Sequence, residues 1–184
     1  MSAMFYHARN YITLYCYNPK EMIKAIIFDL GGVILQPEGF TPTMLAQIFG
    51  VSPDQVLTVY NQVLEDKWGI GKITASQIII ELKVKFPTSK PTQTLVKKLQ
   101  QMYLEQTKID QEILNLIDSL HKNYSVYLLT NTVGIQSQVN KKRGIYSHFD
   151  KVYESYLLGI KKPNKKIYEF VVSDINAKTQ ECFL

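Results

Sequence analysis

The sequence is poor in cysteine and has no long apolar run. Its two cysteines, Cys16 and Cys182, lie near opposite ends of the 184 residues and form neither a CxxC pair nor a His/Cys metal-binding spacing. They indicate a reducing compartment or thiols without a role. No apolar run approaches the roughly 18 residues of a membrane-spanning helix, and no signal-peptide pattern is present. We therefore expect a cytoplasmic protein with no membrane partner.

Positive charge is not concentrated in one place either. The net charge is +5, but the lysines are scattered, and the densest run is only Lys161-Lys162 followed by Lys165-Lys166. Nucleic-acid-binding proteins usually gather basic residues into a patch or stripe, so we expect no nucleic-acid partner. The length favours one domain, or one core that carries an insertion.

Residues 1–21 differ in character from the rest of the chain. They are rich in aromatic residues and show neither a helical nor a strand period, and Met22 stands directly ahead of the first apolar run. We expect an extension outside the fold, which a misplaced start codon would explain. The alternative is an aromatic arm that docks on the core.

The rest of the chain is organised around its first apolar run, Ala25–Phe28. This run is bounded by Lys24 and by Gly31-Gly32, and it predicts a buried strand of a parallel sheet. Asp29 follows at the carboxyl end of the strand, where open α/β sheets bind ligands. Asp29 is therefore a candidate nucleophile or metal ligand, and the alternative is that it only caps a turn.

From residue 37 to about 107 the pattern is helical. Capping signals and apolar spacing predict four helices, which begin near residues 42, 53, 74 and 91. The first has Thr41 as its N-cap, and the second continues from Pro53 through Leu64. Around Ile79 the β-branched run leaves helix or strand open. Because this segment has no His or carboxylate set at metal-binding spacing, we expect a scaffold or lid.

Strand and helix then alternate again. Asp110 is expected to cap a helix, and Ser125–Thr130 is the second apolar strand. Thr130 and Asn131 come just before a helix expected near Gly134. Their side chains and the free N–H groups of the helix start could bind an anion, although such residues are also ordinary helix caps. A third strand is expected over 151–156, a helix follows Lys162-Pro163, and another strand begins at 182.

These motifs, in this order, resemble the haloacid dehalogenase-like superfamily, specifically its phosphatases with a small helical cap. The resemblance implies a Rossmann-like α/β parallel-sheet core, residues 22–36 and 108–184, with an inserted α-helical cap, residues 37–107. The residues that carry it are Phe28-Asp29-Leu30-Gly31-Gly32-Val33-Ile34, Leu128-Leu129-Thr130-Asn131-Thr132, Ser155-Tyr156-Leu157-Leu158-Gly159-Ile160-Lys161-Lys162-Pro163 and the cap turn Trp68-Gly69-Ile70-Gly71-Lys72-Ile73-Thr74.

The resemblance also implies roles for five residues. Asp29 would be the nucleophile that forms an aspartyl-phosphate, and Lys162 would offset the negative charge on Asp29 and the phosphate. Thr130 would hold a phosphate oxygen, and Asn131 would orient the same group. A Mg²⁺ cofactor would bind Asp29 and the backbone carbonyl of Gly31, together with substrate phosphate and water.

Two departures from the family pattern affect these expectations. The phosphatases usually carry a second Asp two residues after the nucleophile, where this chain has Gly31. General acid–base help typically contributes about 10²–10⁴ in rate, so we expect a slow enzyme. The family's acidic fourth motif would follow a strand that resembles 181–184, where this sequence stops, so we expect a C-terminally truncated sequence.

Three functions are compatible with these residues. The first is a Mg²⁺-dependent phosphatase that acts on a small phosphorylated metabolite. The second is a catalytically impaired relative that binds a phosphorylated ligand or a protein partner. The third is a metal-independent 2-haloacid dehalogenase, which the sequence favours least because that group usually has an aromatic residue at the position of Gly31.

Overall fold

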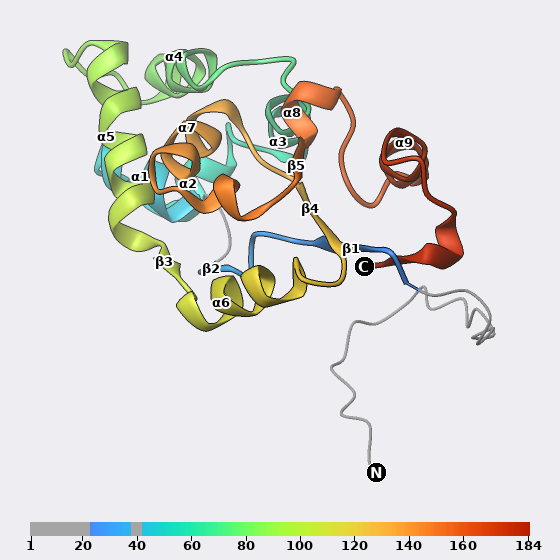
Figure 1. Cartoon of the computed structure of the whole chain (residues 1–184). Helices are drawn as coiled ribbons and strands as arrows, with labels where there is room; N and C mark the ends of the chain where they lie inside the picture. Colours follow the sequence, from blue (N-terminus) through green and yellow to red (C-terminus); the bar gives the residue numbers. More distant parts are fainter. Residues whose placement is uncertain (1–22, 38–41) are drawn as a thin grey trace.

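A computed structural model of the protein describes residues 23–37 and 42–184 (Figure 1). It confirms the expected α/β fold, with a parallel four-stranded sheet in the order β5-β4-β1-β6. The strands are β1 (Ala25–Phe28), β4 (Ser125–Thr130), β5 (Lys151–Glu154) and β6 (Cys182–Phe183). The expected extension 1–21 and the expected helix N-cap Thr41 lie outside the described residues.

Both faces of the sheet are covered by helices, because successive side chains of a strand point to opposite faces. Val126 and Leu128 of β4 pack in the cluster that includes α6 (Gln111–Leu120) and α7 (Gly134–Lys142). Leu129 packs with Ile27 of β1 in the cluster of α9 (Lys165–Asp174) on the other face. The sheet is therefore the middle of three layers (Figure 1).

Local capping chemistry starts the core helices where the sequence predicts. The side chain of Asp110 accepts hydrogen bonds from the backbone N–H groups of Glu112 and Ile113 at the start of α6. Asn164 accepts from the N–H of Lys166 at the start of α9. These bonds satisfy N–H groups that have no partner within the helix.

In the described part of segment 37–107, which the sequence assigns to the cap, the chain forms five helices. They are α1 (Pro42–Phe49), α2 (Pro53–Leu57), α3 (Gln62–Gly69), α4 (Ala75–Lys85) and α5 (Thr92–Gln106). The capping boxes at Ser52 and Thr74 are both present, and residues 78–80 are helical. These helices share one apolar cluster, which also includes Val133 and Ile135 beside the start of α7.

The prediction of one helix from Pro53 through Leu64, and hence of four helices, is wrong. Helix α2 ends at Leu57, and Asn61 accepts hydrogen bonds from the N–H groups of Val63 and Leu64 to start α3. Leu57 and Val63 are 49% and 59% exposed. The apolar spacing therefore did not mark one buried face, and the capping strength of Asn61 decided the break.

A short antiparallel ribbon was not predicted. It pairs β2 (Leu35–Gln36) with β3 (Lys108–Ile109), at the two points where the chain enters and leaves the helical segment. Strands of two residues show no measurable period, so the pattern could not indicate them. The position of the ribbon supports the expected cap boundaries near 37 and 107, which stay a prediction.

The third strand is shorter than the expected 151–156. It ends at Glu154, and α8 (Ser155–Leu158) begins directly afterwards. Ser155 is not part of the strand, because its hydroxyl accepts from the N–H of Thr132 and donates to the carbonyl of Gly69. Two short 3-10 helices, η1 (Ile145–His148) and η2 (Thr179–Glu181), complete the described chain. No helix within the described ranges is both long and apolar enough to cross a membrane.

Candidate active site

The site begins at the carboxyl edge of the two central strands. β1 and β4 run parallel with Phe28 in register with Leu128, so the residues that follow them emerge side by side. Asp29 follows β1, and Thr130 ends β4 with only 2% of its surface exposed. The strand order therefore brings together two candidate residues that are about a hundred positions apart in the sequence.

Lys162 approaches the same edge from the loop after α8. Its Nζ lies 2.7 Å from Oδ1 of Asp29, and the backbone N–H of Leu30 donates to the same oxygen at 2.7 Å. The Lys162 side chain is 15% exposed and the Asp29 side chain 41% exposed. The carboxylate is therefore held in one orientation while part of it still faces the open cavity.

Asn131 holds the loop that carries Lys162. Its Oδ1 accepts from the backbone N–H of Lys162 at 2.8 Å, and its Nδ2 donates to the carbonyl of Lys162 at 3.0 Å. These two bonds fix the backbone from which the Lys162 ammonium reaches Asp29. Asn131 is thus a positioning residue in this structure, and its expected contact with phosphate stays a prediction.

The turn after Thr130 is held by a further set of hydrogen bonds. The N–H of Thr132 donates to Oγ of Ser155 at 3.0 Å, and the Thr132 hydroxyl donates to Oε1 of Gln136 at 3.1 Å. Oε1 of Gln136 also accepts from the N–H of Val133 at the start of α7. The strand-to-helix turn beside Thr130 is therefore rigid, as a preformed anion site requires.

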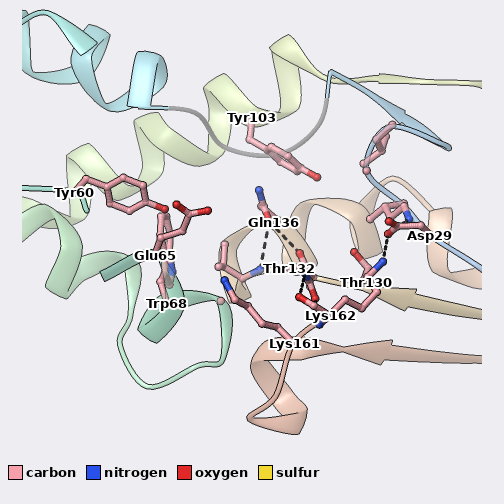
Figure 2. Close-up of a pocket in the computed structure, with 16 residues that line it drawn as sticks. Asp29, Tyr60, Glu65, Trp68, Tyr103, Thr130, Thr132, Gln136, Lys161 and Lys162 are labelled. Atoms are coloured by element: carbon pink, nitrogen blue, oxygen red, sulfur yellow. Dashed lines mark hydrogen bonds and ion pairs between the residues drawn. The ribbon is translucent and has the colours of Figure 1, made fainter. Parts of the chain in front are cut away.

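Cap and core together enclose a cavity of about 350 Å³ beside these residues, a size typical of small-molecule sites. Figure 2 shows Asp29 and Thr130 at one end, with Tyr60, Glu65 and Trp68 of the cap at the other. The residues that line the cavity are Asp29, Leu30, Gly31, Leu35, Tyr60, Glu65, Trp68, Gly69, Tyr103, Thr130, Asn131, Thr132, Val133, Gln136, Lys161 and Lys162.

Two side chains of the core hold the cap over the cavity. The Ser155 hydroxyl donates to the carbonyl of Gly69 at 2.6 Å, and Nζ of Lys161 lies 2.6 Å from Oδ1 of Asp66. Both partners belong to the end of α3, so this part of the cap is docked on the segment that also carries Lys162.

Gly71 shows how close this docking is. It has a φ of +73°, and a Cβ added there would lie 2.2 Å from the backbone oxygen of Tyr156. Only glycine fits this approach without moving the two backbones. The glycine-containing turn that the sequence analysis identified is therefore one of the places where the cap contacts the core.

Three tyrosines around the site have raised pKa values. Burial raises the pKa of Tyr60, and the negative charge of Glu65 raises it further. Burial and the charge of Asp29 raise the pKa of Tyr168, and burial raises the pKa of Tyr103. These hydroxyls therefore stay protonated near neutral pH and can donate hydrogen bonds.

The oxygen donors at the sheet edge match the chemistry of Mg²⁺. The Asp29 carboxylate and the Gly31 carbonyl are hard ligands, and Gly31 lines the same cavity. In the described residues no three His, Cys, Asp or Glu side chains gather as a metal cage. Mg²⁺ sites commonly use one or two carboxylates, with water and substrate phosphate completing the shell, so this donor set fits the ion.

Comparison with known proteins decides the family. A family model for haloacid dehalogenase-like hydrolases matches residues 23–184. The chain belongs to this family. It is 28% identical over 163 residues to D-ribitol-5-phosphate phosphatase from Bacteroides thetaiotaomicron, a match that covers 83% of this chain and 77% of that one.

Solved structures of haloacid dehalogenase family enzymes share the fold. One from Bacteroides thetaiotaomicron has a TM-score of 0.73 and 21% identity, and the match covers 89% of this chain and 83% of that one. Another structure of that enzyme, in complex with magnesium and inorganic phosphate, has a TM-score of 0.66 over 88% of this chain and 83% of that one, also at 21% identity. At this identity the likeness establishes the fold.

The structure brings together Asp29, Gly31, Thr130, Asn131 and Lys162, the five residues singled out from the sequence. The sequence analysis missed the cap side of the cavity, including Tyr60 and Glu65. Their type and spacing carry no signal of their own, because they meet the site only when the cap docks on the core. The glycine turn after Trp68 was identified in the sequence as a family motif, and the structure adds its contact with the core.

Proposed function

We propose that this hydrolase is a Mg²⁺-dependent phosphatase that acts on a small phosphorylated metabolite. The single observation that carries the proposal is the ion pair between Asp29 and Lys162, 2.7 Å apart at the edge of a cavity roofed by the cap. A carboxylate nucleophile needs a nearby cation to offset the charge of an incoming phosphate. The phosphatase identity of the relative and the phosphate bound in a family structure support this choice.

In the first step an Asp29 carboxylate oxygen attacks phosphorus, and the ester oxygen leaves with the electron pair of its bond. The products are an aspartyl-phosphate and an alkoxide, which takes a proton from water. In the second step water attacks phosphorus, the bond between phosphorus and the Asp29 oxygen breaks, and inorganic phosphate leaves; the proton that the attacking water loses neutralises the hydroxide left by the first step. Lys162 offsets the charge in both steps, and Thr130 with the rigid turn behind it holds phosphate oxygens. When bound through Asp29 and Gly31, Mg²⁺ supplies further charge neutralisation.

Gly31 favours a slow enzyme. It stands two residues after the nucleophile and has no side chain that could protonate the leaving oxygen, so water must serve. Loss of general acid–base help lowers rates by about 10²–10⁴. The absence of an acid at this position also favours a second candidate function, that of a relative that binds phosphorylated ligands without hydrolysing them.

The test compares wild type with Asp29→Asn on p-nitrophenyl phosphate, with Mg²⁺ and with EDTA. We expect slow Mg²⁺-dependent turnover that Asp29→Asn lowers by at least about 10³-fold. Turnover that persists in EDTA would overturn the Mg²⁺-dependent reading. If wild type binds a beryllofluoride phosphate mimic better than Asp29→Asn but turns over no ester, the binding protein is the correct reading.

A further inference from the structure

The cap end of the cavity differs chemically from the phosphate end. Tyr60, Glu65 and Trp68 gather there, opposite Asp29 and Thr130 (Figure 2). Tyr60 and Trp68 are buried, with 7% and 4% of their surface exposed, and their rings meet edge to face at a centroid distance of 6.2 Å. This aromatic pair gives the cap end a fixed wall, which we call the cap subsite together with Glu65.

The charge of the cap subsite is negative. Four charged side chains line the cavity, and they are Asp29, Glu65, Lys161 and Lys162. Lys162 pairs with Asp29 and Lys161 pairs with Asp66. Within the ranges 23–37 and 42–184, no hydrogen bond or ion pair joins the Glu65 carboxylate to another side chain. Glu65 therefore presents an acceptor to the cavity.

The neighbouring hydroxyl responds to this charge. The pKa of Tyr60 is raised by burial and further by the negative charge of Glu65, so the two groups lie close enough to interact. The Tyr60 hydroxyl remains a donor, and the Glu65 carboxylate is an acceptor only. A substrate group at this end must therefore offer hydrogen-bond donors, while a second anion would face Glu65 with no free cation beside it among the described lining residues.

We propose that Glu65 is the specificity-determining residue of this enzyme, selecting phosphate esters whose far end carries hydroxyl or ammonium donors and rejecting those that carry a second anion. The inference rests on the proposed function, because it takes the phosphate end to be the edge at Asp29. The inference adds which chemical groups the cap accepts at the far end of the substrate, and it names Glu65 as the side chain that selects them.

The alternative role of Glu65 is structural. It stands in the first turn of α3, where a negative charge stabilises the positive end of a helix dipole. That role predicts a small loss of stability in Glu65→Gln and no change in the choice between substrates. Substrate preference, expressed as a ratio of two kcat/KM values, therefore separates the two roles and does not depend on the absolute rate.

The experiment measures kcat/KM for D-ribitol 5-phosphate and D-ribonate 5-phosphate, which differ only by a carboxylate in place of the terminal hydroxymethyl group. We expect wild type to prefer the polyol by about tenfold or more, the effect of one hydrogen bond to a charged group. Glu65→Gln should bring the ratio close to one, and Glu65→Lys should reverse it. Glu81→Gln, the same charge change at an exposed position of α4, should keep the wild-type ratio.

Each other result has a defined meaning. If wild type hydrolyses p-nitrophenyl phosphate through Asp29 but Glu65→Gln keeps the wild-type ratio, the inference is wrong and the proposed function stands. If wild type hydrolyses none of the three esters, the proposed function fails. The inference is then decided by calorimetric affinities of the Asp29→Asn protein for the two five-carbon phosphates, and equal affinities overturn it.

Discussion

At the scale of single residues, two adjacent lysines point to different partners. Lys162 lies 2.7 Å from Asp29, whereas Lys161 lies 2.6 Å from Asp66 of the cap. Asn131 holds the backbone of Lys162 from both its N–H and its carbonyl, and this fixes the point from which the Lys162 side chain reaches Asp29. The family resemblance singled out Lys162 and gave Lys161 no role, and the structure adds that Lys161 pairs with the cap.

The first prediction compares these two lysines. Lys162→Met should lower kcat/KM on p-nitrophenyl phosphate by about 10²–10³-fold, because it removes the cation beside the nucleophile. Lys161→Met should lower it by less than about tenfold, since that ammonium bonds the cap. Steady-state kinetics with matched thermal melts measure both effects. Equal losses in the two variants would contradict the assigned partners.

The second prediction restores a carboxylate two residues after the nucleophile. Gly31, unlike Gly32 with its φ of 73°, is not among the described glycines that have a positive φ, so its backbone accepts a side chain without left-handed strain. Gly31→Asp should raise kcat by about tenfold or more, as a general acid does. Gly31→Asn, which has the same shape but cannot protonate a leaving group, is the matched control. If both variants change kcat alike, general-acid chemistry is not what Gly31 lacks.

At the scale of elements, one turn makes a close contact between the cap and the segment that carries Lys162. Gly71 approaches the backbone oxygen of Tyr156, and Ser155 donates to the carbonyl of Gly69. These contacts join the end of α3 to α8, just ahead of the loop that carries Lys162. The element that roofs the cavity and the element that positions the cation are therefore in direct contact.

The third prediction isolates this contact with two glycines. Gly71 and Gly50 have φ values of +73° and +69°, but a Cβ at Gly50 meets nothing within 4 Å. Gly50→Ala should therefore cost only the left-handed strain, about 1 kcal/mol. Gly71→Ala adds a backbone clash and should lower the free energy of unfolding by a further 1–3 kcal/mol or so. Urea denaturation measures both, and equal costs would mean that the approach to Tyr156 is not tight.

The fourth prediction concerns the edge strand and pH. Lys24, which precedes β1, pairs with Glu181, which precedes β6. The hydrogen bond from Lys24, with that from the Lys178 backbone, lowers the pKa of Glu181. Since the folded-state pKa lies below the unfolded value of about 4.3, this stabilisation is present above that pH and is lost as pH falls through the folded pKa.

Lys24→Met should therefore reduce the drop in melting temperature between pH 7 and pH 3. The reduction is expected to be small, because the Lys24 side chain is 65% exposed. Lys122→Met, at a surface lysine without an ion pair in the described part of the chain, is the control. An acid sensitivity that is the same in both variants would show that the pair does not contribute.

At the scale of the whole molecule, much of the core was predictable from local patterns. The runs Ala25–Phe28 and Ser125–Thr130 are strands as predicted. A short apolar run that is followed by polar residues is typical of a buried strand in an α/β protein. The helix starts expected near residues 53 and 74 are also present, and capping boxes at Ser52 and Thr74 begin these helices. These features depend on residues close together in the sequence.

What could not be predicted depends on contacts between distant segments. The helix break before Asn61 needed the exposure of Leu57 and Val63, and the ribbon of β2 and β3 needed two segments about seventy residues apart. Motifs at the strand ends anticipated that Asp29, Thr130 and Lys162 meet at one edge of the sheet, and their roles toward phosphate stay predictions. The cap end was not anticipated, because Glu65 has ordinary surroundings until the cap docks on the core.

The measurement that tests the account most directly is to trap the covalent intermediate on Asp29. The protein is mixed with acetyl phosphate and Mg²⁺, quenched in acid and digested, and its peptides are weighed by mass spectrometry. The account predicts one added phosphoryl group on the peptide that contains Asp29, absent from Asp29→Asn. Hydrolysis of acetyl phosphate with the phosphoryl group on another residue, or with the same rate in Asp29→Asn, would contradict it.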